Sequence, residues 1–237
     1  MTLREAPRSD LVDPAALHRL LAWLSPSFPV GAFSYSHGLE WAIEDGTVRD
    51  APGLEAWIAD ILLHGAGRSD AILFAHAAGA IDDPDRLAEV AELAAALAPG
   101  AERRLESLAQ GRAFMIAVTA AWPNAPLARA AERLAGDEGP AYPVAVAVAA
   151  AAHGVPRRPA AEAYLHAFAA NIVSAGLRAV PLGQTDGQKI IARLSPVVTR
   201  AVDRAEGQPL EAVGGAVFRA DIASMKHETQ YTRLFRS

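Results

Sequence analysis

The chain has 237 residues, of which 51% are hydrophobic and 21% are charged, and this composition is typical of a globular protein with a sizeable core. A formal net charge of -5 argues against a nucleic-acid-binding surface, and the absence of cysteine excludes disulfides, thiolate metal sites and cysteine nucleophiles. The longest apolar stretch, residues 141–152, contains a proline and is shorter than the ~20 residues that span a bilayer. Residues 1–14 carry charged side chains where a signal peptide has an apolar core, so we expect a cytoplasmic protein.

Residues 1–13 are polar, and we expect them to form a flexible segment. After them, segments rich in Ala and Leu with apolar residues at helical spacing alternate with short Pro, Gly and Asp breaks. Two helices are predicted to begin at Pro52 and Pro84. Further helices are predicted at residues 15–24, 36–45, 69–80, 99–122, 127–134, 143–153, 159–178, 185–203, 209–217 and 219–232.

Local signals refine two of these helices. Ser69 or Asp70 is the predicted N-cap of the helix that ends near residue 80. Thr185 or Asp186 is the predicted N-cap of the helix at 185–203, in which Pro196 is expected to cause a kink or a split.

The pattern as a whole predicts an all-α protein. Only the valines at 144, 146 and 148 alternate as in a strand, and the alanines around them favour a helix. There is no long linker, composition shift or repeat of fixed period. We therefore expect one domain, residues 14–237, that forms a bundle of roughly ten helices and ends in a C-terminal tail at residues 221–237.

Motifs for catalysis or metal binding are missing from the sequence. The seven histidines form no HExxH pair and no His-rich tract, and no GxSxG nucleophile elbow or carboxylate pair in an apolar context occurs. Residues 182–189, LGQTDGQK, lack the GxxxxGK[ST] spacing of a phosphate loop, and helix termination at Pro181 and Gly183 explains them instead. We predict no catalytic residue and no metal ligand.

The loop at residues 24–40, LSPSFPVGAFSYSHGLE, places rigid aromatic residues on an irregular backbone. Pro and Gly bend and stiffen this loop, which carries Phe28, Phe33 and Tyr35. Such aromatics either anchor a protein interface or plug the end of the bundle, and the composition alone does not choose between these roles.

The tail at residues 221–237, DIASMKHETQYTRLFRS, is amphipathic and cationic. It is either an ordinary terminal helix or a segment that another protein holds. Leu234 and Phe235 lie within three residues of the end, where chains fray unless something docks them. We therefore expect residues from Glu228 onward to be mobile in the free protein and to order on a partner. Deletion after Thr229 is then expected to leave thermal stability unchanged.

Three motifs in this order resemble the UreF family of urease accessory proteins: FPVGAFSYSHGLE at 28–40, AVPLGQTDGQK at 179–189 and DIASMKHETQYTRLF at 221–235. The length and the number of helices also match, so the resemblance covers nearly the whole chain. It implies an all-helical, non-catalytic protein that forms a homodimer and binds a UreD- or UreH-type accessory protein. It also implies recruitment of a UreG-type GTPase for the insertion of nickel into apo-urease.

The resemblance also implies where partners bind. Phe33 and Arg233 are similar to family positions of dimer or tail contacts, and Arg178 is similar to a candidate contact with the GTPase. Together with the neighbouring motif residues, the predicted partner-binding set is Phe33, Tyr35, Arg178, Lys189, Tyr231, Arg233, Leu234 and Phe235. No cofactor is expected to bind tightly to the chain, nickel being handled by the complex.

Two other classes of protein remain as alternatives. The first is a stand-alone helical enzyme with an active site in a cleft, which turnover by the isolated chain would reveal. The second is a helical regulator of transcription, which the net charge and the lack of a basic recognition helix disfavour.

Overall fold

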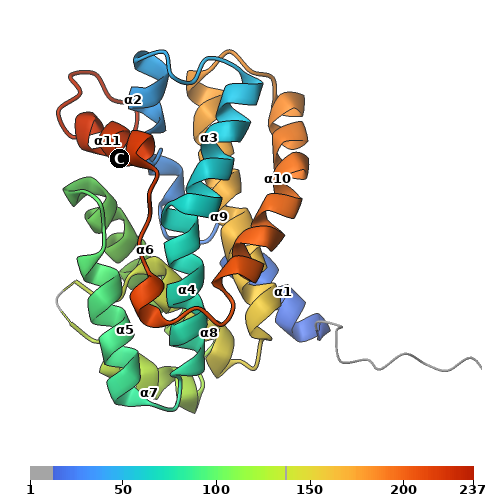
Figure 1. Cartoon of the computed structure of the whole chain (residues 1–237). Coiled ribbons are helices and arrows are strands. Elements are labelled where there is room, and N and C mark those ends of the chain that lie inside the picture. Colours follow the sequence, from blue (N-terminus) through green and yellow to red (C-terminus); the bar gives the residue numbers. More distant parts are fainter. Residues whose placement is uncertain (1–12, 137) are drawn as a thin grey trace, which may run out of the picture.

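The computed structural model describes residues 13–136 and 138–237, and it shows helices and no β-strand in these ranges (Figure 1). The elements are α1 (Pro14–Trp23), η2 (Ala32–Ser34), α2 (Leu39–Glu44), α3 (Ala51–His64), α4 (Ala66–Gly79), α5 (Pro84–Ala96), α6 (Ala101–Ala121), α7 (Ala125–Arg133), α8 (Tyr142–Ala152), α9 (Arg157–Ala179), α10 (Gln184–Ala205), η3 (Leu210–Ala212) and α11 (Phe218–His227). The predicted all-α fold is confirmed. The expected flexible segment at residues 1–13 lies, apart from Asp13, outside the described residues.

Side-chain caps and prolines begin several of the helices. The Asp50 and Asp83 carboxylates and the Asn124 amide oxygen each accept a hydrogen bond from a backbone N–H in the first turn of α3, α5 and α7, respectively. A proline lies in the first two positions of each of these helices, where its missing N–H costs nothing. The predicted starts at Pro52 and Pro84 are confirmed within one residue.

Both predicted N-caps are wrong. Helix α4 begins directly after Gly65, which also ends α3, so Asp70 lies inside the helix and bonds to Tyr164 instead. Helix α10 begins after Gly183, and Asp186 reaches back from its first turn to the Gly183 N–H.

Of the kink or split that was predicted at Pro196, the split is wrong, because α10 continues as one helix through this exposed residue.

The predicted helix at 209–217 is reduced to the single turn η3. Arg68 of α4 donates from one guanidinium nitrogen to the carbonyl oxygens of Ala212 and Gly214, at 2.7 and 2.8 Å. These carbonyls are therefore unavailable to a helix, and the chain runs extended along α4 to reach α11. The last helix ends at His227, five residues before the predicted end.

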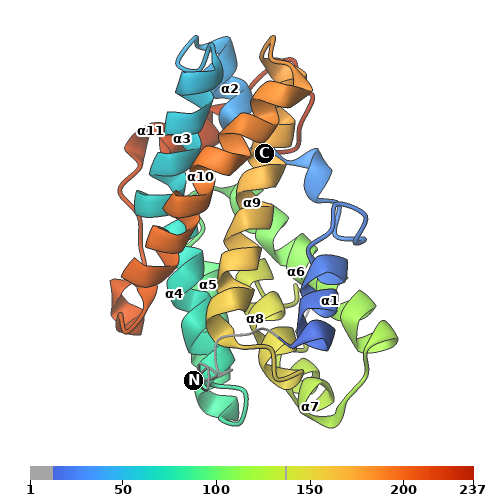
Figure 2. The same ribbon diagram turned by 90° about the vertical axis from the view of Figure 1, so that its right-hand side faces the viewer.

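The core is built around α8, in which every residue from Pro143 to Ala150 is buried. Helices α4 and α6 cover it, while α9 and α10 pack against each other and α10 packs against α3 (Figure 2). Trp23 of α1 meets Phe114 and Trp122 edge to face, which attaches the first helix to α6. No helix of the described residues has the length and apolar character needed to cross a membrane.

The close contact between α6 and the start of α8 depends on Gly111. A Cβ at this position would lie 2.0 Å from the carbonyl oxygen of Pro140. We therefore predict that Gly111→Ala lowers the free energy of unfolding by about 1–3 kcal/mol, because the two backbones must separate. Thermal and urea denaturation of the purified variant measure this loss.

The matched control is Gly79→Ala at the end of α4, where an added Cβ meets nothing within 4 Å. This variant should be as stable as the natural chain or slightly more stable. Equal losses in the two variants would contradict the role of Gly111.

Candidate partner-binding site at the C-terminal segment

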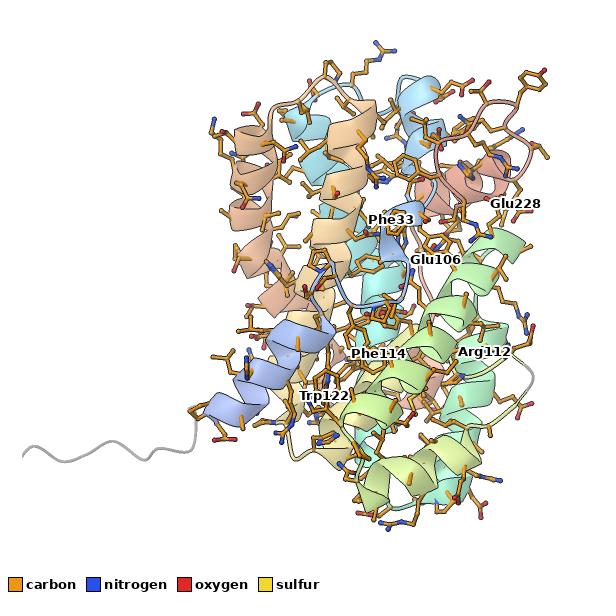
Figure 3. All side chains as sticks on the ribbon, turned by 180° about the vertical axis from the view of Figure 1, so that it is seen from behind. Phe33, Glu106, Arg112, Phe114, Trp122 and Glu228 are labelled. Carbon is orange, nitrogen blue, oxygen red and sulfur yellow. The ribbon has the colours of Figure 1, made fainter. Side chains whose placement is uncertain are left out.

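Residues 228–237, here called the C-terminal segment, follow α11 and return over α2 and the beginning of α6 (Figure 1). Glu228 accepts a hydrogen bond from the backbone N–H of Ala101 at 2.8 Å, which caps α6 from a residue far along the chain. Its carboxylate also lies at the positive end of the α6 dipole. Figure 3 shows Glu228 beside the first turn of α6 and Glu106 further along the same helix.

A second carboxylate, Glu40 of α2, binds the backbone of the segment. One oxygen accepts the N–H of Leu234 at 2.6 Å, and the other accepts the N–H of Phe235 at 3.0 Å. The second oxygen also lies 3.2 Å from Nε2 of His227. Glu40 is buried, so these charge-assisted bonds replace its hydration and determine where the segment lies.

Glu102 in the first turn of α6 holds two side chains of this region. It lies 2.6 Å from Nδ1 of His227 and accepts a bond of 2.5 Å from the Arg233 guanidinium. The arginine that the sequence placed in partner binding therefore makes its ion pair within the chain.

Glu106, one turn further along α6, receives the end of the segment. The hydroxyl of Ser237 donates to it at 2.7 Å, and His37 and Arg103 pair with it from the other side. Burial alone raises the pKa of Glu106, but the charges of Arg103 and His37 and the bonds from His37 and Ser237 outweigh it and lower the pKa to about 2. We call Glu40, Glu102, Glu106 and Glu228 the carboxylate clasp.

The bend before α2 brings Glu40 to this position. His37 and Gly38 both have positive φ values, 58° and 72°, so the loop turns tightly into α2. A Cβ on Gly38 would lie 2.6 Å from the backbone nitrogen of Ser224 in α11. Glycine here lets α2 and α11 approach closely enough for Glu40 to reach His227.

Arg178 connects the loop before α2 to the segment. Its guanidinium donates to the carbonyl oxygen of Phe33 at 2.8 Å and lies 4.4 Å from the ring centroid of Phe235. Phe33 itself is 66% exposed, whereas Tyr35 is buried and Phe28 packs on Phe114. Phe28 and Tyr35 therefore pack against the protein, as expected of aromatics that plug the end of the bundle, whereas Phe33 faces outward.

The structure corrects the expectation that Leu234 and Phe235 form one free apolar pair. Phe235 is 5% exposed and belongs to the core, while Leu234 is 73% exposed. The segment bends at these two residues, and only Leu234 is left at the surface. The clasp likewise disagrees with the expectation that residues from Glu228 onward are mobile in the free protein, because it bonds them to α2 and α6.

The remaining residues of the predicted set lie at the surface. Tyr231 is fully exposed in the C-terminal segment. Lys189 lies apart from the segment, on α10, and pairs with Asp186 at 3.2 Å. The structure thus brings together Phe33, Arg178, Arg233, Leu234 and Phe235 and leaves Lys189 elsewhere.

Sequence reasoning missed the clasp itself. Its residues did not stand out because Glu40, Glu102 and Glu106 come from two helices and no local spacing joins them. The available signal was the position of Glu40 and of His227–Glu228 inside two of the three family motifs. A buried acidic residue in a motif indicates a specific partner, and Glu40 of the first motif binds residues of the third motif, at 221–235.

A cavity of about 1040 Å³ lies beside the clasp and is lined by Glu106 of the clasp and by Arg103, which pairs with Glu106. Its polar wall includes Asp70, which accepts a 2.7 Å bond from the hydroxyl of Tyr164. Burial raises the pKa of Asp70 to about 6, against the opposing effect of that bond. In the described part of the chain, no three or more His, Asp or Glu side chains are grouped so as to hold a metal ion.

This carboxyl predicts a pH dependence of stability. Ionisation of a carboxyl whose folded pKa exceeds its unfolded value destabilises the folded state. The free energy of unfolding of the natural chain should therefore fall as the pH rises from about 4 to about 6 and stay lower above that range. We predict that Asp70→Asn, which cannot ionise, gains about 2 kcal/mol relative to the natural chain between pH 4 and pH 7. Urea denaturation at a series of pH values measures this gain. A stability difference that does not vary with pH would contradict it.

Comparison with known proteins identifies the family. A family model named UreF matches residues 48–195, which cover α3 to α9 and half of α10. A urease accessory protein UreF of Rhodopseudomonas palustris (strain BisB5) is 53% identical over 245 residues, with all of both chains covered. Proteins of the same name from R. palustris (strain BisB18) and Bradyrhizobium sp. (strain ORS 278) are 55% and 53% identical over 225 residues, covering 94% of this chain and 92% of each relative.

The chain therefore belongs to the UreF family of urease accessory proteins. The resemblance seen in the three motifs is confirmed, because the full-length match to the BisB5 protein includes the loop before α2 and the C-terminal segment as well as the helices between them.

Proposed function

We propose that this chain is a non-catalytic scaffold for the assembly of the nickel centre of urease. It forms a homodimer in the cytoplasm, binds a UreD- or UreH-type accessory protein, and recruits a UreG-type GTPase to apo-urease. Nickel passes through the complex and has no tight site on this chain, whose sequence offers no thiolate. The observation that carries the proposal is the C-terminal segment, which the clasp fixes on the body of the protein with Leu234 outward.

The surface for the UreD-type partner consists of α11 and the segment. Phe218, Ile222 and Met225 follow one another at helical spacing on α11, and each is at least half exposed. Leu234 and Tyr231 add exposed apolar surface in the segment that follows. An apolar face of this kind with a polar rim is typical of a protein interface. The clasp supports binding because a segment that is already ordered loses less conformational entropy in the complex.

The surface for self-association lies at the loop before α2. Phe33 is exposed and borders the same cavity as Leu17 and Leu21 of α1, which are exposed as well. Arg178 fixes the backbone of Phe33 through its carbonyl oxygen, so the ring projects from a rigid support. A rigid aromatic residue among leucines is a common anchor of a symmetric interface.

For the homodimer we predict that Phe33→Arg weakens self-association at least tenfold and leaves the helix content unchanged. A charge without a partner is costly to bury in an interface, whereas on the free surface it is tolerated. Sedimentation velocity and circular dichroism measure the two quantities. If the variant remains dimeric, Phe33 does not lie in the interface.

For the UreD-type partner we predict that Leu234→Asp abolishes its capture in a pull-down and prevents urease activation. The melting temperature should stay within a few degrees of the natural value, because Leu234 is exposed. Ile116→Asp, which changes a residue of similar exposure on α6, is the matched control and should capture the partner normally. Capture by the Leu234 variant would show that the segment is not the docking element.

The alternative, a stand-alone helical enzyme, draws on the cavity with its buried Asp70 and Tyr164. Turnover of any substrate by the isolated chain, lost in Asp70→Asn, would favour it.

A further inference from the structure

The cavity beside the carboxylate clasp has a net acidic lining. Its volume of about 1040 Å³ lies at the upper end of the range of about 300–1,000 Å³ that is typical of sites for small organic ligands. Four carboxylates border it, those of Asp70, Glu106, Glu162 and Asp221, and Arg103 is the only Arg or Lys among the described residues of its wall. A cavity with this excess of negative charge attracts a cation and repels an anion.

Two of these carboxylates already have a cationic partner. Glu106 pairs with Arg103, and Glu162 lies 3.3 Å from the Arg158 guanidinium. The other two form no ion pair within the part of the chain that the structure describes, and burial raises the pKa of both. A cation in the cavity would supply the counter-charge that the protein does not provide.

Asp70 is the carboxylate that a ligand can reach inside the molecule. One of its oxygens accepts the bond from the hydroxyl of Tyr164 at 2.7 Å, and the other accepts no hydrogen bond from the described residues. Although Asp70 lies deep in the bundle, protein atoms cover it only in part, because it borders the cavity. Its pKa of about 6 leaves it ionised at neutral pH. The free oxygen is therefore an anionic acceptor that is open to the cavity.

The rest of the wall fits a cation that carries a hydrocarbon chain. The rings of Tyr164 and Tyr142 lie 5.5 Å apart beside this carboxylate and line the same cavity, and the faces of such rings attract ammonium groups. The apolar side chains of the wall include Leu20, Leu24, Phe28, Leu73 and Phe168. A metal ion fits less well, because it needs several ligands together and the described residues offer no group of three His, Asp or Glu.

We propose that this cavity is a binding site for an aliphatic amine, whose ammonium group pairs with Asp70 while its hydrocarbon chain packs on the leucine and phenylalanine side chains of the wall. Tyr164 orients the carboxylate through its hydroxyl, which leaves one oxygen for the ligand. This binding activity goes beyond the role in urease assembly and does not depend on it.

The first test compares two probes on the natural chain, hexylamine and 1-hexanol, by calorimetry at about pH 7.5. The two molecules share one hydrocarbon chain, so their difference reports the ammonium group. The amine should bind tighter by about tenfold or more, because its bond to a carboxylate is charge-assisted. Equal affinities, or no binding of the amine, would overturn the proposal. No variant is needed, so the result does not depend on whether a variant folds.

The second test places the amine in the cavity. Asp70→Asn keeps the shape of the side chain and removes its charge, so it should weaken hexylamine by about tenfold or more and leave 1-hexanol unchanged. Asp60→Asn, at an exposed site on α3, is the matched control and should bind hexylamine as the natural chain does. An unchanged affinity of Asp70→Asn for the amine would contradict the assignment.

A titration with Ni²⁺ separates the amine from a metal ion as the ligand. The natural chain and Asp70→Asn should give the same result with Ni²⁺. Nickel binding that is lost in this variant, with no binding of hexylamine to the natural chain, would show that the cavity holds a metal ion instead. These measurements involve no partner protein, so a negative result leaves the assembly role to its own pull-down test.

Discussion

The bonds of the buried Glu40 carboxylate determine most of the arrangement around the proposed site. A carboxylate that is 8% exposed must find donors within the protein, and this one finds two backbone N–H groups and an imidazole. Those bonds fix the path of the segment over α2. That path in turn puts Phe235 into the core and Leu234 on the surface.

Bonds and conformational entropy oppose each other in the docking of the segment. Each charge-assisted bond contributes about 1.5–3 kcal/mol, and each ordered residue costs about 1–2 kcal/mol of conformational entropy. The two contributions are therefore of similar size, and the burial of Phe235 adds to the bonds. Glu106 connects the segment to the interior, because it bonds Ser237 and also borders the cavity beside α6. A change at the end of the segment therefore reaches the cavity wall through one side chain.

Sequence periodicity was sufficient for the helices because their apolar faces are local features. Proline predicted the starts of α3 and α5 for the same reason. The errors arose where distant groups decide the structure. Arg68 takes the carbonyl groups that a helix at 209–217 would need, and Asp70 bonds Tyr164 across the bundle instead of capping α4. The clasp was not predictable for that reason either, since only the fold brings Glu40 to residues 234 and 235.

The cap that Glu228 provides for α6 has a consequence for the order of folding. The donor N–H of Ala101 and the accepting carboxylate are separated by 127 residues along the chain. During synthesis, α6 emerges long before its cap, so its first turn carries unsatisfied N–H groups until nearly the whole chain has been translated. Closing so long a loop is slow compared with forming a helix. The cap of the first turn of α6 and the surface that α11 presents therefore both wait for the synthesis of residues around 228.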